Sequence, residues 1–302
     1  MSRKSEDRRD STTPTTGRWE ATFPESIEIP ADSTLFAFRF IKLTTSFILD
    51  KRDLLGDSFF KSRAIEKMLI PQFDKSNPAS VRIDKKMNGL KPAIEKRYLR
   101  EFAIVFYQRP DEEDILEVYS LRLMYGDNGE ISVSVNSGLG TEETNQNLIL
   151  ATFTDTNTTK SVFMETVRKL YRCIKQLKSL PEDSDASFRI SFTDEAPKDY
   201  MPDGFDMSPR LYELSSEHVR YQVGVVCGGH HKVQLLAASR LAKTPIIDLN
   251  QTRASINQSI LVPTPTKAKG LRGTENTRPN VRSPYGQTLP ITKRKGQARS
   301  SK

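Results

Sequence analysis

KPAIEKRYLREFAIVFY, at residues 91–107, predicts a helix that leads directly into a strand. Leu90, Ile94 and Tyr98 repeat at helical spacing, and the stretch then becomes almost continuously apolar, as in a buried strand. After a charged turn, apolar and polar residues alternate over residues 115–125, which is the period of a half-buried strand. The sequence therefore predicts a central pair of antiparallel strands preceded by a helix.

Helices are also predicted on either side of this pair. Residues 33–49 and 158–180 each carry an apolar stripe at helical spacing, and Pro181 ends the second one. The stripes consist of Phe36, Phe40, Leu43 and Phe47, and of Phe163, Val167, Leu170, Ile174 and Leu177. A shorter helix is expected at residues 63–69, and a loop or weak hairpin at residues 76–86.

The remaining strands are predicted from short alternating runs. A turn signal at residues 127–129 precedes alternation over 131–135, and a further strand is expected at 188–192. Two more strand-like runs, 219–226 and 232–238, are separated by a glycine-rich turn. Helices on one face of an antiparallel sheet make an α+β domain, and the last two runs make a C-terminal hairpin.

Composition separates a folded body from two polar ends. The chain has 302 residues with 36% hydrophobic residues, and residues 1–18 and 244–302 lack an apolar period. We expect both ends to be disordered and residues 19–243 to be folded. The formal net charge is +8, and residues 251–302 hold 11 basic side chains against one acidic one. Such a tail suits contact with nucleic acid, nuclear import, or simple solvation.

The sequence gives little indication of a catalytic site or a metal-binding site. Cys227, His230 and His231 form the one cluster of suitable residues, and they lie at a glycine-rich turn without the further ligands or orienting group that a site needs. We expect a structural turn, no enzyme activity and no cofactor. Without a long apolar stretch, neither a signal peptide nor a membrane span is expected.

Several strings together resemble the HORMA domain of meiotic chromosome proteins. They are the helix-to-strand passage at 91–107, EVYSLRL at 117–123, the helix at 158–180, and FRISFTD at 188–194 followed by DYMPDGF at 199–205. The resemblance covers about residues 19–243 and implies three helices packed on an antiparallel sheet with a C-terminal safety-belt hairpin. It implies that residues 200–240 form a safety belt over a bound peptide, the closure motif, which adds a strand beside 188–192.

The resemblance also implies which residues contact this peptide. The expected peptide-binding residues are Phe188, Ile190, Phe192, Tyr200, Tyr221, Val223 and Val225. A closure motif is expected near residues 280–290, because RSPYG resembles the Pro-Tyr-Gly motif of nematode-type axis proteins. Its residues are Arg282, Ser283, Pro284, Tyr285 and Gly286, and Tyr285 is the one aromatic residue of the tail.

These features predict a non-enzymatic adaptor of the meiotic chromosome axis in the nucleus. The expected partners are closure motifs of other HORMA proteins or the chain's own tail, and a remodelling AAA+ ATPase. Chromatin contact is expected to be mainly indirect, with no membrane and no small-molecule substrate. The alternatives are a HORMA adaptor of the checkpoint or DNA-repair type, or a nucleic-acid-binding protein with a basic tail.

Overall fold

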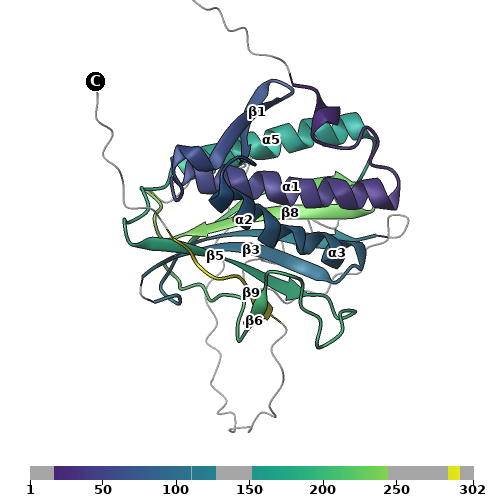
Figure 1. Cartoon of the computed structure of the whole chain (residues 1–302). Coiled ribbons are helices and arrows are strands. Elements are labelled where there is room, and N and C mark those ends of the chain that lie inside the picture. Colours follow the sequence, from purple (N-terminus) through teal and green to yellow (C-terminus); the bar gives the residue numbers. More distant parts are fainter. Residues whose placement is uncertain (1–16, 110, 127–151, 244–284, 293–302) are drawn as a thin grey trace, which may run out of the picture.

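The main feature of the fold is an antiparallel sheet (Figure 1). The structure is a computed structural model that describes residues 17–109, 111–126, 152–243 and 285–292. The strand order of the sheet is β6-β9-β5-β3-β4-β8-β7, with β10 also paired to β5. The strands are β3 (Leu99–Gln108), β4 (Ile115–Tyr125), β5 (Ser184–Phe192), β6 (Asp206–Ser208), β7 (Val219–Gly228), β8 (His231–Ser239), β9 (Tyr285–Gln287) and β10 (Ile291–Thr292). The predicted central pair is confirmed as β3 and β4, and β3 is also paired with β5.

Three helical segments pack on one face of this sheet, which confirms the predicted α+β fold (Figure 1). They are α1 (Pro30–Lys51), α5 (Thr156–Lys175), and the pair α2 (Pro78–Asn88) and α3 (Leu90–Glu95), which meet at Gly89. The apolar stripes predicted for α1 and α5 are buried in the main core. Trp19, in the short 3-10 turn Trp19–Ala21, is fully buried against Phe23 and Phe163.

The helix predicted at residues 63–69 is wrong, because this stretch forms a hairpin. Strands β1 (Phe60–Ile65) and β2 (Met68–Phe73) pair with each other and form a separate two-stranded sheet beyond the 3-10 turn Asp57–Phe59. Glu66 takes a left-handed backbone conformation in the turn, which a continuing helix does not allow. The helical spacing of its apolar residues is misleading, since Leu69 is 66% exposed.

The loop or weak hairpin predicted at residues 76–86 is also wrong, because the segment is largely helix α2. The Asn77 side chain accepts hydrogen bonds from the backbone N–H groups of Ala79 and Ser80, and Pro78 follows as the first helical residue. Both features favour a helix start. The buried stripe is short and lies among charged residues, which hides its period in the sequence.

The second face of the sheet is covered by a later part of the chain. Leu211 and Tyr212 pack there with a small apolar cluster that includes Val105, Val118 and Leu236. These two residues lie between β6 and β7, which occupy opposite ends of the sheet. The chain therefore crosses beneath the sheet between these two edges. The strand predicted at 131–135 and most of both predicted disordered ends lie outside the residues that the structure describes.

Candidate peptide-binding site

Strand β5 is bordered by β3 on one side and by the C-terminal tail on the other. We call residues 285–292 the tail strand; they include β9 and β10, and both pair antiparallel with β5. Ile190 lies opposite Gly286, and Ala186 lies opposite Ile291. The tail strand therefore extends the sheet along β5 between Asp185 and Ser191, and main-chain pairing supplies the contact.

Strand β6 closes the outer side of β9. Asp206, Met207 and Ser208 pair with Gln287, Gly286 and Tyr285 in turn, so β9 lies between β5 and β6 (Figure 1). The Ser208 hydroxyl also donates a hydrogen bond of 3.2 Å to the side-chain oxygen of Gln287. Release of β9 thus requires separation from strands on both of its edges.

Gly286 is buried at the closest approach between the tail strand and the body. A Cβ atom at this position would lie 2.6 Å from the sulfur of Met201 and 3.0 Å from Cγ1 of Ile190. Both distances are shorter than ordinary van der Waals contact. The neighbouring Tyr285 is half-buried and packs on the other face, against the cluster that contains Leu211 and Tyr212.

Thr288 and Ile291 extend the contact beyond the predicted motif. The Phe188 N–H donates to the Thr288 hydroxyl over 3.0 Å, and the Thr288 N–H donates to the Phe188 carbonyl over 2.8 Å. Ile291 is only 6% exposed and belongs to the main core, whereas Leu289 is 68% exposed. The tail strand is therefore fixed at both ends, by Gly286 and by the Thr288–Ile291 portion.

Residues 193–218 form what we call the covering segment. Its first part packs Tyr200 against Phe192 at a ring-centroid distance of 5.7 Å and includes β6. Its second part lies on the second face of the sheet, where the Tyr212 hydroxyl donates to the fully buried carboxylate of Glu101. Burial, and then the Glu101 charge, raise the pKa of Tyr212 well above its usual range, so its proton stays available as a donor.

Arg189 of β5 makes a second buried polar contact with the covering segment. Its guanidinium donates to the Leu211 carbonyl and to the Glu112 carbonyl, each over 3.2 Å, and it lies 3.8 Å from the Glu112 carboxylate. The side chain is nearly inaccessible to solvent, and burial lowers the pKa of Arg189 from its ordinary value. Two buried polar contacts, at Glu101 and Arg189, thus hold the covering segment across the sheet.

The structure brings together only part of the expected peptide-binding set. Phe188 and Ile190 lie on β5 beside the tail strand, with their side chains in the main core. Phe192 and Tyr200 pack on each other where β5 leads into the covering segment. Tyr285 and Gly286 lie in β9, whereas Arg282, Ser283 and Pro284 lie outside the described ranges.

Tyr221, Val223 and Val225 require a correction, because they lie at the opposite edge of the sheet. They belong to β7, which pairs with β8, and β8 pairs with β4 instead of β5. Strands β5, β3, β4 and β8 separate β7 from β9. Of the expected belt at 200–240, the part that covers the tail strand is therefore 200–218, within the covering segment, and not the terminal hairpin.

The Cys227–His231 turn is held by hydrogen bonds to helix α1. Ser33 of α1 is the hub of these contacts: its hydroxyl donates to the Gly228 carbonyl, accepts from the His230 N–H over 3.0 Å, and lies 2.7 Å from Nδ1 of His231. Burial lowers the pKa of His231 to about 4. Within the described ranges, no group of three or more potential ligands is placed to hold a metal ion.

The fold and the covered tail strand define a class of α+β domain in which an extended segment becomes part of the sheet and another segment of the chain lies over it. The family model of the HORMA domain matches residues 33–231, well over half of the chain. The chain belongs to the HORMA domain family. Members of this family are non-enzymatic adaptors. No helix in the described parts of the chain has the length and apolar character required to cross a membrane.

Individual relatives agree with this assignment. HORMA domain-containing protein 2 of Bos taurus is 27% identical over 219 residues, which cover 70% of this chain and 69% of the relative. HORMA domain-containing protein 1 of Homo sapiens is 27% identical over 187 residues, which cover 61% of this chain and 45% of the relative. The match to the human protein thus spans less than half of its length.

Solved structures share the fold at low sequence identity. C. elegans HTP-1 bound to a HIM-3 closure motif has a TM-score of 0.70 at 23% identity, covering 76% of this chain and 99% of that one. C. elegans HTP-2 bound to HTP-3 closure motif 1 has a TM-score of 0.69 at 22% identity, covering 78% of this chain and 97% of that one. These likenesses establish the architecture of the domain.

Proposed function

We propose that this chain is an adaptor of the meiotic chromosome axis that captures closure-motif peptides of other HORMA proteins by strand addition. The observation that carries the proposal is the position of β9 between β5 and β6. The structural neighbours HTP-1 and HTP-2 are described as bound to closure motifs, and their fold is the fold of this chain. In this role the adaptor acts in the nucleus and supports homologue pairing, synapsis and crossover control.

The proposal includes a closure motif in the chain's own tail. The motif begins near residue 282 and, from the contacts of Thr288 and Ile291, extends to about residue 291. About 40 residues separate the body from this motif, and a flexible coil of that length has an expected end-to-end distance on the order of 35 Å, comparable to the width of a domain of this size. The effective concentration of the tail is then near millimolar, so self-closure outcompetes a partner motif of similar affinity.

Such a closed state needs a device that reopens it. The covering segment is held by two buried polar contacts, and the tail strand is paired on both edges. Spontaneous release is therefore slow. We propose that a remodelling AAA+ ATPase opens the closed state. We also propose that the partners make most of the contact with chromatin and that the basic tail adds a salt-dependent contribution.

The experiment uses the full chain with its tail disabled by Gly286→Val and Ile291→Asp. A labelled peptide of residues 280–292 should be captured by this variant with a one-to-one stoichiometry and slow release. The wild-type chain, which is closed on itself, should capture the same peptide at least about tenfold more slowly. Absence of capture by the tail-disabled variant, while its circular dichroism matches that of the wild type, would exclude strand addition at β5.

Self-closure is separated from head-to-tail chaining by light scattering over a concentration series. A self-closed chain remains a monomer at all concentrations. In chaining, each tail enters the next body and open filaments grow. Growth that depends on concentration and disappears with Tyr285→Ala would favour chaining, and the closure motif would then act between copies.

A further inference from the structure

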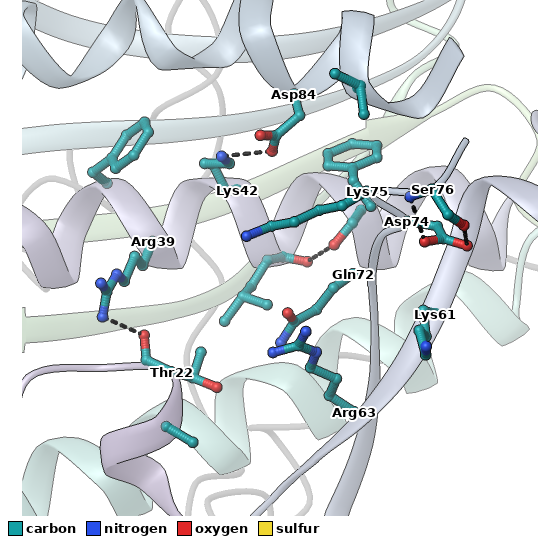
Figure 2. A pocket seen from close by; sticks show the side chains of 16 residues that line it. Thr22, Arg39, Lys42, Lys61, Arg63, Gln72, Asp74, Lys75, Ser76 and Asp84 are labelled. Atoms are coloured by element: carbon teal, nitrogen blue, oxygen red, sulfur yellow. Dashed lines mark hydrogen bonds and ion pairs between the residues drawn. The ribbon is translucent and has the colours of Figure 1, made fainter. Parts of the chain in front are cut away.

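A pocket on the helical side of the domain carries an unbalanced positive charge. It has a volume of about 540 Å³ and lies between α1, α2, the β1–β2 hairpin and the N-terminal turn (Figure 2). Five cationic side chains line it against two carboxylates, those of Asp74 and Asp84. Its volume is within the range of about 300–1,000 Å³ that is typical of ligand sites.

The carboxylates and some of the cations are already engaged. Lys42 forms an ion pair of 2.5 Å with Asp84, and the Arg39 guanidinium donates to the Thr22 carbonyl over 2.8 Å. Asp74 accepts hydrogen bonds from the backbone N–H and the hydroxyl of Ser76, which lower its pKa. These contacts fix the walls of the pocket and leave its remaining positive charge uncompensated.

Arg63 and Lys75 supply most of that remaining charge, because Lys42 is paired with Asp84 and the charge of Lys61 acts on Asp74. The Arg63 and Lys75 side chains are exposed, and neither has a hydrogen bond or an ion pair with any residue that the structure describes. Figure 2 shows Lys75, Gln72 and Arg63 directed toward the same space in front of α1. The side-chain nitrogen of Gln72 is buried and lacks an acceptor among the described residues, so the wall also contains an unsatisfied donor.

The same pocket has an apolar lining. Phe38 and Leu43 of α1 and Phe73 of β2 contribute to it, and the first two are almost fully buried. Cations and an amide donor next to apolar side chains suit a peptide that carries carboxylates beside an apolar residue. A duplex nucleic acid offers only its phosphates to such a concave site, and the apolar lining would remain unused.

We propose that this pocket is a docking site for an acidic peptide segment of a partner protein. Arg63 and Lys75 bind its carboxylates, the Gln72 amide donates to one of its oxygen atoms, and an apolar side chain enters between Phe38 and Phe73. The pocket lies on the side of α1 and β1, away from β9 and β6 at the other end of the domain (Figure 1). The two sites can therefore be occupied at the same time.

The test uses fluorescence anisotropy on the full chain with two degenerate peptide pools. In the acidic pool, three positions are aspartate or glutamate and one is leucine or phenylalanine; in the neutral pool, the acids are replaced by asparagine or glutamine. The acidic pool should bind at least about tenfold more tightly than the neutral one. The double variant Arg63→Glu and Lys75→Glu should lose about tenfold or more in affinity for it.

The matched control is the double variant Lys169→Glu and Lys178→Glu, which changes the net charge equally at exposed positions outside the pocket. Its affinity should stay within about twofold of the wild type. Gln72→Leu keeps the net charge and should weaken binding several-fold, which bulk electrostatics alone does not produce. Arg63→Gln with Lys75→Gln serves if the charge-reversed variant does not fold.

Three outcomes would overturn the proposal. In the first, the wild-type chain does not bind the acidic pool more tightly than the neutral pool. In the second, the pocket variant and the control variant lose affinity equally, which would indicate an effect of the net charge alone. In the third, the pocket variant loses affinity for a short DNA duplex while its peptide binding is unchanged, which would assign the pocket to nucleic acid. Because the tail-disabled variant should bind the acidic pool like the wild type, this test is independent of peptide capture at β5.

Discussion

The Tyr212 hydroxyl donates a hydrogen bond to the carboxylate of Glu101, a fully buried residue in the centre of the sheet. The same carboxylate accepts a hydrogen bond of 2.6 Å from the Ser120 hydroxyl. Tyr212 belongs to the covering segment, while Glu101 and Ser120 belong to β3 and β4. This contact therefore ties the segment that overlies the tail strand to the central strands β3 and β4.

Loss of this contact should speed release of the tail. Tyr212→Phe keeps the ring and removes the hydroxyl, so a buried acceptor loses one of its donors at a cost of about 1–2 kcal/mol. We expect the labelled tail peptide to leave the tail-disabled chain about five- to thirtyfold faster, measured by displacement with unlabelled peptide. Tyr221→Phe, at the β7 edge, is the control and should leave the rate unchanged. Equal rates for all three proteins would contradict a fastening role for Tyr212.

The size of residue 286 should set the affinity of the motif. Alanine adds a Cβ that must displace the Met201 sulfur and press on Ile190, and valine adds two further methyl groups. We expect about fivefold weaker binding for the peptide with Gly286→Ala, and at least about fiftyfold weaker binding with Gly286→Val. Isothermal titration with the tail-disabled chain measures both.

A body variant provides the check on this packing argument. Met201→Ala creates space on one side of Gly286 and should recover most of the affinity of the alanine peptide. If Met201→Ala fails to recover it, contact with Met201 is not what excludes a side chain at position 286, and the requirement for glycine arises from the backbone or from Ile190.

Thr288 should contribute through its hydroxyl more than through its size. Thr288→Val keeps the volume but removes the acceptor of the buried Phe188 N–H, which then has no partner. An unsatisfied buried donor costs about 1–3 kcal/mol, so the peptide should bind roughly ten- to a hundredfold more weakly. Thr288→Ser should stay within about threefold of the wild type. A valine peptide that binds as well as the serine peptide would disprove this role.

The central part of the fold follows from local signals in the sequence. The strands around Ile104 and Tyr119, and the helices with Phe40 and Phe163, have long apolar periods that match their buried faces. The β1–β2 hairpin could not be predicted from the sequence, because it depends on pairing between two strands across the Glu66 turn. In addition, the apolar residues up to Leu69 have the spacing of a helix. Periodicity reports which faces are apolar, and it does not report non-local pairing.

The site was predictable only where a single residue type stands out. Tyr285 and Gly286 are conspicuous in a tail without other aromatics, and they lie in β9. Ile291 and Leu289 look equivalent in the sequence, yet only Ile291 is buried. Their difference arises from the register on β5. Likewise, the hydrogen bond between Tyr212 and Glu101 depends on the path of the covering segment across the sheet, which local sequence patterns do not report.

The turn that Ser33 anchors should lose stability in acid. Burial first, and then the charges of His230 and Arg97, lower the pKa of His231 to about 4 from the ordinary value of 6.5. The unfolded chain therefore binds a proton at this residue at a higher pH than the folded chain does. Stability contributed by the neutral imidazole is fully present above about pH 6.5 and is lost as the pH falls toward about 4.

This difference should produce a slope in the free energy of unfolding. One pKa unit corresponds to about 1.4 kcal/mol, so His231 alone should lower the free energy of unfolding by about 3 kcal/mol between about pH 7 and about pH 4. Urea unfolding at several pH values measures it as the difference between the wild type and His231→Gln, since other groups titrate in both proteins. His230→Gln, which alters the partly exposed neighbour, should keep most of the slope. Parallel pH profiles for the wild type and His231→Gln would show that His231 is not the group that destabilises the fold in acid.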